Sequence, residues 1–187
     1  MTKSEQYYAS KLAIAARKSC VDAGILEEND KKLDIDRLSK IVYHFGGLLG
    51  IDKESNPYIV KYSNKSFDIV LGNQFQTEED WPLIVLRGLG IIFLGNDNII
   101  NDKTIRIDDR CVSNDLAAAT ENVDFSFLIQ GMDVFAREFL MPENLYDQSM
   151  VENMTSDGKF DCIEMAKDFG AGYMKVLTRG EDLGKWH

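Results

Sequence analysis

The chain has 187 residues, 44% of them hydrophobic, and 31 acidic against 21 basic residues give it a formal net charge of −10. This length allows one packed domain with a small appendage. The acidic balance argues against sequence-independent binding of nucleic acid, which needs a basic surface that displaces counterions. It suits a solvated surface, a basic protein partner or mimicry of nucleic acid.

Cysteine usage and hydropathy point to the cytoplasm. Cys20, Cys111 and Cys162 are widely spaced and form no CxxC pair, so neither a disulfide framework nor a cysteine zinc site is predicted. No apolar run reaches the ~18 residues that a membrane-spanning helix needs, and Met1–Lys11 is too polar for a secretory signal. We therefore expect a cytoplasmic protein that does not enter a membrane.

The spacing of apolar residues divides the chain into helices, a small group of strands and further helices. A period near 3.6 predicts a helix, and a short β-branched run between turn residues predicts a strand. In chain order we expect helices at Ser4–Gly24 and Leu33–Phe45, a hairpin of strands at Tyr58–Tyr62 and Ser66–Leu71, a helix at Pro82–Leu94, a strand at Lys103–Asp108, a short helix at Ala117–Ala119, a long helix at Phe125–Met141, a polar helix or linker at Asn144–Met154, two helices within Phe160–Thr178 that separate at Gly170–Gly172, and a charged tail at Thr178–His187. This order predicts an α+β fold.

Two polar residues stand out within these elements. The segment Pro82–Leu94 is apolar on nearly every face except at Arg87, which predicts a helix buried on all sides. Arg87 should therefore reach the surface or pair with an acid, in preference to a ligand-binding role. His44 falls late in its helix, where a histidine more often stabilises the helix end or the edge of the core than binds metal.

Several segments, taken in order, resemble the ImmA/IrrE family of bacterial and phage metallopeptidases. The matching segments are Leu33–Leu49 as the family's opening helix, Pro82–Gly95 in the place of its zinc helix, Phe135–Pro142 (FAREFLMP) as its FA-x-E-LLMP segment, and Phe160–Gly184 as its closing unit, with Ala166, Phe169-Gly170, Arg179 and Leu183-Gly184 at the marked positions. The resemblance covers about residues 30–184. It implies an N-terminal helix (1–30), a gluzincin-like peptidase core with a small sheet packed on helices (31–142), and a C-terminal helix-turn-helix-like unit packed on that core (143–187).

The residues that would carry the family's chemistry are changed. A gluzincin binds zinc through His-Glu-x-x-His, whose two histidines lie one helical turn apart and whose glutamate polarises the metal-bound water. The resemblance places the first histidine at Arg87, the glutamate at Gly88, the second histidine at Ile91 and the third, acidic ligand at Gly131. None of these residues can ligate a metal. The resemblance therefore favours a pseudo-metallopeptidase without metal or cofactor over an enzyme.

The leading hypothesis is a protein that acts by binding another protein. Members of the resembling family are typically encoded by phages and mobile elements, or regulate stress responses, and they act on helix-turn-helix repressors. A member without ligands could bind a partner in the old substrate cleft, lined by Arg87, Gly88, Ile91, Gly131 and Asp133. The expected partner is a transcriptional repressor or a nucleic-acid-binding host defence protein.

Three alternatives stay open. A hydrolase could recruit a metal through Asp124, Asp133 and His44, although a zinc site with one histidine and scattered aspartates is uncommon. A DNA-binding regulator could use 161–179, where Lys167, Lys175 and Arg179 are opposed by Asp161, Glu164 and Asp168. An unrelated α+β regulatory domain could match FAREFLMP by chance. The acidic runs Glu78-Glu79-Asp80 and Asp108-Asp109 are interpreted as solvated loop charges, and Gly88-x-Gly90 as a site of close packing.

Overall fold

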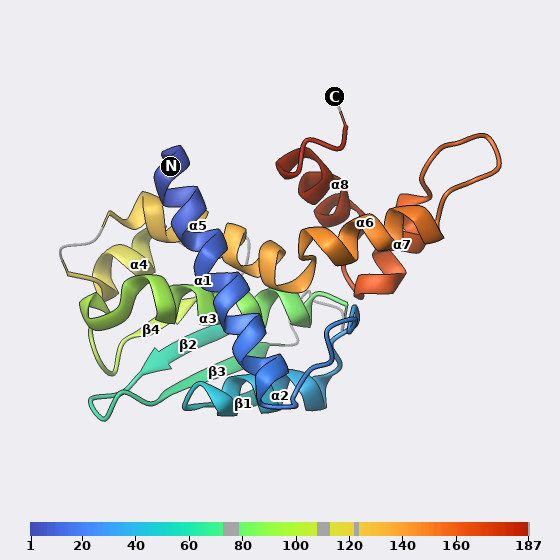
Figure 1. Cartoon of the computed structure of the whole chain (residues 1–187). Coiled ribbons are helices and arrows are strands. Elements are labelled where there is room, and N and C mark those ends of the chain that lie inside the picture. The colour runs from blue at the N-terminus through green and yellow to red at the C-terminus, as the bar shows by residue number, and fades with distance from the viewer. Residues whose placement is uncertain (73–78, 108–112, 122–123, 187) are drawn as a thin grey trace.

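A computed structural model describes residues 1–72, 79–107, 113–121 and 124–186, and it has a mixed α+β fold (Figure 1). Its helices are α1 (Lys3–Asp22), α2 (Ile35–His44), α3 (Trp81–Gly95), the 3-10 turn η1 (Asn96–Asn98), α4 (Ser113–Ala119), α5 (Phe125–Leu140), α6 (Glu143–Glu152), α7 (Cys162–Phe169) and α8 (Tyr173–Asp182), and its strands are β1 (Gly47–Asp52), β2 (Tyr58–Lys61), β3 (Phe67–Gly72) and β4 (Thr104–Arg106). The expected α+β class is confirmed.

The four strands form one mixed sheet in the order β1-β3-β2-β4. β1 runs parallel to β3, whereas β2 is antiparallel to both β3 and β4. The expected hairpin is the β2–β3 pair. Its turn is made by Lys65 at φ 69°, and the Asn64 side chain accepts a hydrogen bond from the Ser66 backbone N–H at 3.0 Å. Polar turn residues of this kind reverse the chain at little steric cost.

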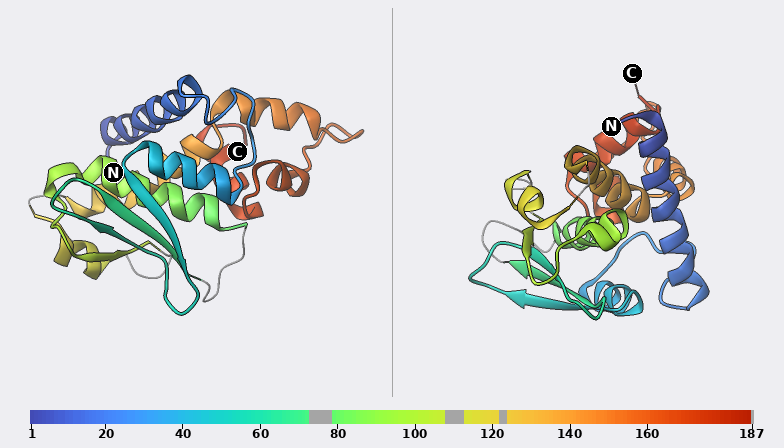
Figure 2. Two further views of the ribbon diagram at one scale, coloured as in Figure 1. Left: turned by 90° about the horizontal axis from the view of Figure 1, so that it is seen from below. Right: turned by 90° about the vertical axis from the view of Figure 1, so that its left-hand side faces the viewer.

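Helix α3 packs against one face of the sheet, and α5 packs on α3. Figure 2 shows α1 alongside these two helices, reaching down to the level of α2. Aromatic rings make contacts between the end of α2, α3 and α5. The ring centroids of Phe45 and Phe93 are 5.0 Å apart, and those of Phe93 and Phe135 are 5.6 Å apart. The expected burial of Pro82–Leu94 on all sides is observed for almost every residue of α3. The main core therefore lies between the sheet and α5, with α3 running through it.

Side-chain caps explain where three helices begin. Thr2 and Glu5 form a reciprocal capping box at the start of α1, Asp34 caps α2, and Asp124 caps α5. Such caps satisfy backbone N–H groups that have no partner within the helix. Pro142 separates α5 from α6, as expected from its missing N–H.

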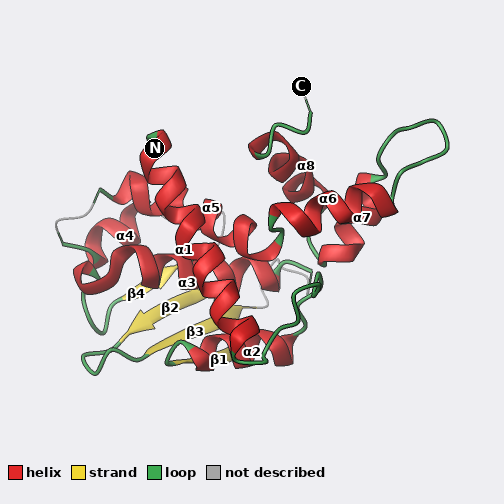
Figure 3. Ribbon diagram, in the orientation of Figure 1, coloured by secondary structure: helices red, strands yellow, loops and turns green. Residues whose placement is uncertain are grey.

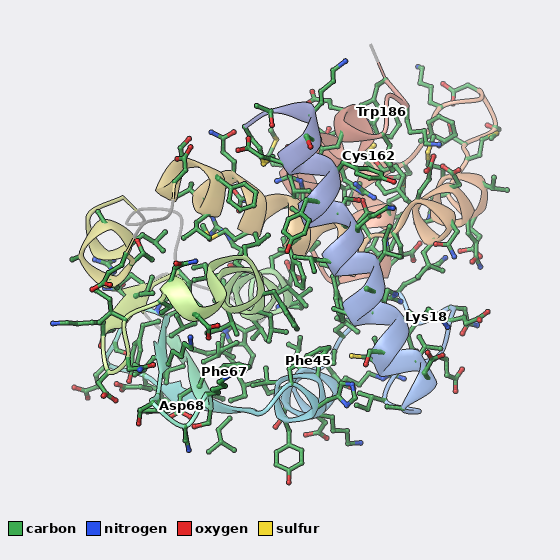
Figure 4. The ribbon with its side chains drawn as sticks, turned by 60° about the vertical axis from the view of Figure 1, so that its left-hand side comes forward. Lys18, Phe45, Phe67, Asp68, Cys162 and Trp186 are labelled. Carbon is green, nitrogen blue, oxygen red and sulfur yellow. The ribbon has the colours of Figure 1, made fainter. Side chains whose placement is uncertain are left out.

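The C-terminal helices α6, α7 and α8 form a group beside the core, on the right of Figure 3. Gly170, in the left-handed conformation at φ 58°, ends α7, so the expected break at Gly170–Gly172 is present. The charged tail expected at Thr178–His187 is wrong for its first half, because α8 continues to Asp182. Trp186 then packs back onto α8, where its indole N–H donates to the Leu177 carbonyl at 3.0 Å (Figure 4).

Strand β1 was not expected, since the first strand was predicted at Tyr58–Tyr62 and the resemblance took Leu33–Leu49 as one segment. The chain leaves α2 at Phe45 and enters β1 two residues later. A Cβ built on Gly47 would come within 2.3 Å of the Phe67 ring of β3, so glycine lets the two strands approach. The polar segment 144–154, expected as a helix or a linker, is α6 over Glu143–Glu152.

In the part of the chain that the structure describes, no helix has both the length and the apolar character required to cross a bilayer.

Candidate functional site

Arg87 is the charged residue of α3, and it is held by an ion pair. Its Nε donates to Asp133 Oδ1 of α5 at 2.6 Å, and its Nη1 donates to the Ile107 carbonyl, just after β4, at 3.3 Å. Of the two outcomes expected for this residue, pairing with an acid is the one observed. The Arg87 side chain is buried, whereas that of Asp133 is 35% exposed. The pair therefore joins α3, α5 and the sheet edge and remains open to solvent on its Asp133 side.

Gly88 and Ile91, the next two positions of the predicted cleft, lie in packed interior. A Cβ built on Gly88 would meet Ile59 Cγ2 at 2.9 Å and Ile69 Cδ1 at 3.1 Å, both on the sheet. Ile91 has no exposed surface. These positions bring α3 close to the sheet, and a larger side chain at Gly88 would have to displace isoleucines.

The structure places Gly131 away from the Arg87–Asp133 pair. A Cβ built there would meet Leu94 Cδ1 at 2.8 Å, with Phe127 and Ala9 next. Position 131 thus contacts the end of α3 and helix α1. Residues two apart on a helix point in roughly opposite directions, so Asp133 and Gly131 cannot face the same neighbour. Of the five residues expected to line one cleft, the structure brings Arg87 and Asp133 together and assigns Gly88, Ile91 and Gly131 to packing contacts.

The residues considered for an alternative metal site are engaged separately. Asp124 accepts from the Ser126 backbone N–H at 2.9 Å, and His44 Nε2 lies 2.8 Å from Ser19 Oγ. Asp133 is bonded to Arg87. Across residues 1–72, 79–107, 113–121 and 124–186, no three His, Cys, Asp or Glu side chains gather closely enough to hold a metal ion. Glu78, Asp108, Asp109, Cys111 and His187 lie outside the described residues.

Two described cysteines are poor nucleophiles in this fold. Burial raises the pKa of the Cys20 thiol to about 11, with Arg17 opposing the shift, and burial likewise raises the pKa of Cys162. A thiol must lose its proton to attack an electrophile or to ligate a metal. Both therefore remain protonated at neutral pH and offer no support for cysteine catalysis.

A second ion pair attaches the C-terminal helices to the core. Arg179 Nη2 of α8 lies 2.8 Å from Glu138 Oε1 of α5, and Arg179 Nε donates to the Met141 carbonyl at 2.8 Å. Ser10 Oγ of α1 donates to the other Glu138 oxygen at 2.9 Å. Both charged side chains are almost fully buried. The sequence suggested DNA contact as an alternative role for Arg179 and gave no role to Glu138, although an acid inside the apolar run FAREFLMP indicates that it needs a partner.

The basic residues of 161–179 do not form an outward-facing cationic surface. Arg179 is buried and Lys167 pairs with Glu164 on the same helix. Asp161 caps α7, where its carboxylate accepts from the Ile163 backbone N–H at 3.0 Å. A DNA-binding face needs several cations turned outward. This surface does not offer that set.

No family model and no curated protein matches the chain.

Proposed function

We propose that this protein is a non-catalytic, gluzincin-like protein of the ImmA/IrrE type that acts by binding another protein. The observation that carries the proposal is the Arg87–Asp133 ion pair. The resemblance places the first zinc histidine at Arg87, and a guanidinium cannot ligate a metal. Its positive charge would also repel a divalent cation. In this proposal a protein-internal cation takes the place of the zinc ion.

The packing around Gly88 supports the same proposal. The resemblance assigns the catalytic glutamate to this position, yet Ile59, Ile69 and Ile107 fill the space into which a side chain would grow. An active peptidase must keep room there for a carboxylate and a water molecule. The loss of the glutamate is therefore matched by isoleucine side chains that close the site.

The proposed partner is a helix-turn-helix repressor or a nucleic-acid-binding defence protein, and the chain would be a regulator or antagonist carried by a phage or mobile element. The Asp133 carboxylate, 35% exposed, presents the open side of the ion pair to such a partner. The helix-turn-helix-like unit would serve as a structural support, since its Arg179 is buried against Glu138. In the cytoplasm the free thiols of Cys20 and Cys162 would stay reduced.

The test begins with the tagged protein, purified without added metal and used to capture proteins from its host lysate at low and moderate salt. Mass spectrometry should identify a repressor or a defence nuclease. Capture of a basic nuclease should weaken steeply with salt, because that association is electrostatic. Metal analysis of the same preparation should find far less than one zinc per chain, and stoichiometric zinc would overturn the non-catalytic assignment.

The charge-swapped double variant Arg87→Asp/Asp133→Arg then tests the site itself. It retains an ion pair while reversing the charge that a partner meets, so it should fold and lose at least tenfold in affinity for the captured protein. Lys11→Glu, an exposed change on α1, is the control and should bind as the natural chain does. Unchanged affinity in the folded swap would show that the partner does not contact this site.

A further inference from the structure

The three C-terminal helices and the tail after them, residues 143–186, are called here the C-terminal group, and they contact one another through an aromatic cluster. The ring centroids of Tyr146 and Phe169 are 6.3 Å apart, and those of Tyr146 and Trp186 are 6.2 Å apart. The Tyr146 hydroxyl also donates to the Val176 carbonyl of α8 at 2.8 Å. These contacts join α6, α7, α8 and the tail without using a residue of the core.

The C-terminal group is joined to the rest of the chain by charged side chains at three places. Among the described residues, α7 packs on α6 and on α8, whereas none of these three helices packs as closely on a helix or strand of the core. The ion pairs that cross between the two parts are Arg179–Glu138, Asp182–Arg137, and Lys31 with both Glu152 and Asp168. Two parts of a chain that share a small, charged interface commonly move relative to each other.

The buried pair among these contacts is incompletely bonded. Arg179 Nη2 lies 2.8 Å from Glu138 Oε1, yet within the described part of the chain this nitrogen has no hydrogen bond of good geometry. A buried ion pair offsets the loss of hydration only when its geometry is good. Separation of the two parts returns both charges to water, so the hydration regained lowers the cost of separation.

The backbone between α5 and α6 can turn without breaking either helix. Met141 and Pro142 lie between the two helices with ψ angles of 63° and 150°, outside the helical range. The Met141 N–H donates back to the Arg137 carbonyl of α5, and the Pro142 carbonyl accepts from the Tyr146 N–H of α6. Each backbone hydrogen bond thus stays on its own side of the connection. Rotation at Met141 preserves both helices while it moves the C-terminal group away from Glu138.

We propose that the C-terminal group is a hinged arm that docks on the core through these ion pairs and undocks by rotation at Met141–Pro142. Salt favours the undocked form, since it weakens the attraction between the opposite charges. The helices of the arm stay folded when it undocks. The hinge and the ion pairs include none of the five residues of the Arg87 site, so this inference does not rest on the proposed function.

The natural chain tests the proposal directly when it is compared at low and high salt. Small-angle X-ray scattering should give a larger radius of gyration at high salt, while far-UV circular dichroism shows unchanged helix content. Carbodiimide labelling of the Glu138 carboxylate, read by mass spectrometry, should become at least threefold faster. Met132 is also on α5 but has no exposed surface within the core, so its oxidation by hydroxyl radicals should not change.

Charge reversal tests the pair that holds the arm. Glu138→Lys places a second cation beside Arg179, so this variant should have the larger radius already at low salt, with unchanged helix content. Glu181→Lys is the matched control, because it makes the same substitution at an exposed residue of α8, and its radius should equal that of the natural chain. The double variant Glu138→Lys/Arg179→Glu restores opposite charges and should dock again.

Three results would overturn the proposal. A radius that is the same at low and high salt, with Glu138 labelling unchanged, would show that the arm is fixed, and this comparison decides even if Glu138→Lys fails to fold. Met132 oxidation that rises together with Glu138 labelling would show that the whole chain unfolds as one unit. Light scattering that shows a dimer at high salt would assign the larger radius to association.

Discussion

Two of the ion pairs that join helix α5 to its neighbours differ in burial. Asp133 pairs with Arg87 of α3, with the carboxylate 35% exposed. Glu138 pairs with Arg179 of α8, and there both side chains are almost fully buried and further satisfied by Ser10 and the Met141 carbonyl. A buried pair holds two parts of a fold together, whereas a pair open to solvent can also meet a partner.

The largest effect should come from breaking the closed pair. Arg179→Met leaves the Glu138 carboxylate buried without its cation, and the loss of one member of a buried pair costs about 3–5 kcal/mol. Urea unfolding followed by circular dichroism measures this loss. The double variant Glu138→Leu/Arg179→Met removes both charges and should recover much of the stability. A loss below about 1 kcal/mol in Arg179→Met would show that Glu138 reaches water.

Breaking the open pair should cost less. In Arg87→Met the Asp133 carboxylate can be hydrated on its exposed side, so the expected loss is about 1–3 kcal/mol, as for a hydrogen bond to a charged group. The same urea experiment measures it, with Asp133→Asn as the complementary variant. A loss as large as that of Arg179→Met would contradict the difference in burial on which the comparison rests.

Breaking the neighbouring Arg137–Asp182 ion pair should change the free energy of unfolding only slightly. Arg137 Nε of α5 lies 2.8 Å from Asp182 Oδ2 of α8, with both side chains nearer to solvent than those of Glu138 and Arg179. Asp182→Asn should change the free energy of unfolding by about 0–1 kcal/mol, as is usual for surface pairs. Thermal unfolding of this variant beside Arg179→Met compares two contacts between the same two helices. Equal losses would mean that burial does not set their contributions.

The smallest effect concerns the link between Lys31, in the segment between α1 and α2, and Glu152 of α6. Hydrogen bonds from Lys31 and then Gln148 lower the pKa of Glu152. A carboxylate with a lowered pKa stabilises the folded state above its ordinary pKa, and this contribution disappears as the pH falls through the folded value. Melting temperatures of the natural chain and of Lys31→Met should therefore differ slightly at pH 7 and converge at acidic pH. A difference that grows in acid would reverse the sign argued here.

Local sequence patterns predicted most of the helices, because their causes are local. The apolar run of α3, the hairpin turn at Asn64-Lys65 and the stop at Pro142 each follow from neighbouring residues. The sequence did not predict β1, because GLLGID contains two glycines, which are uncommon in strands, and lies close after a helix. Its strand conformation depends on pairing with β3, some 20 residues away in sequence.

Only part of the candidate site was predicted, because the rest depends on contacts between residues that are distant in sequence. That Arg87 reaches the surface or pairs with an acid follows from its apolar neighbours, but the identity of the acid depends on the rotation of α5. The rotation turns Asp133 toward Arg87 and Gly131 toward Leu94. It is set by contacts across helices, such as the approach of Gly90 to Met132, where a Cβ on the glycine would lie 3.0 Å from the Met132 Cα. Residue spacing alone does not contain that information.

The packing of Trp186 onto α8 gives the protein a separate optical reporter in each region. The chain has two tryptophans, Trp186 among the C-terminal helices and Trp81 at the start of α3. Indole emission changes when the ring passes from the protein interior to water. The variant Trp81→Phe keeps Trp186, so its emission reports on the C-terminal helices, and Trp186→Phe keeps Trp81, so its emission reports on the core. Coinciding emission midpoints would describe one cooperative unit bound through Arg179, and separate midpoints would describe a C-terminal unit that detaches while the sheet remains folded.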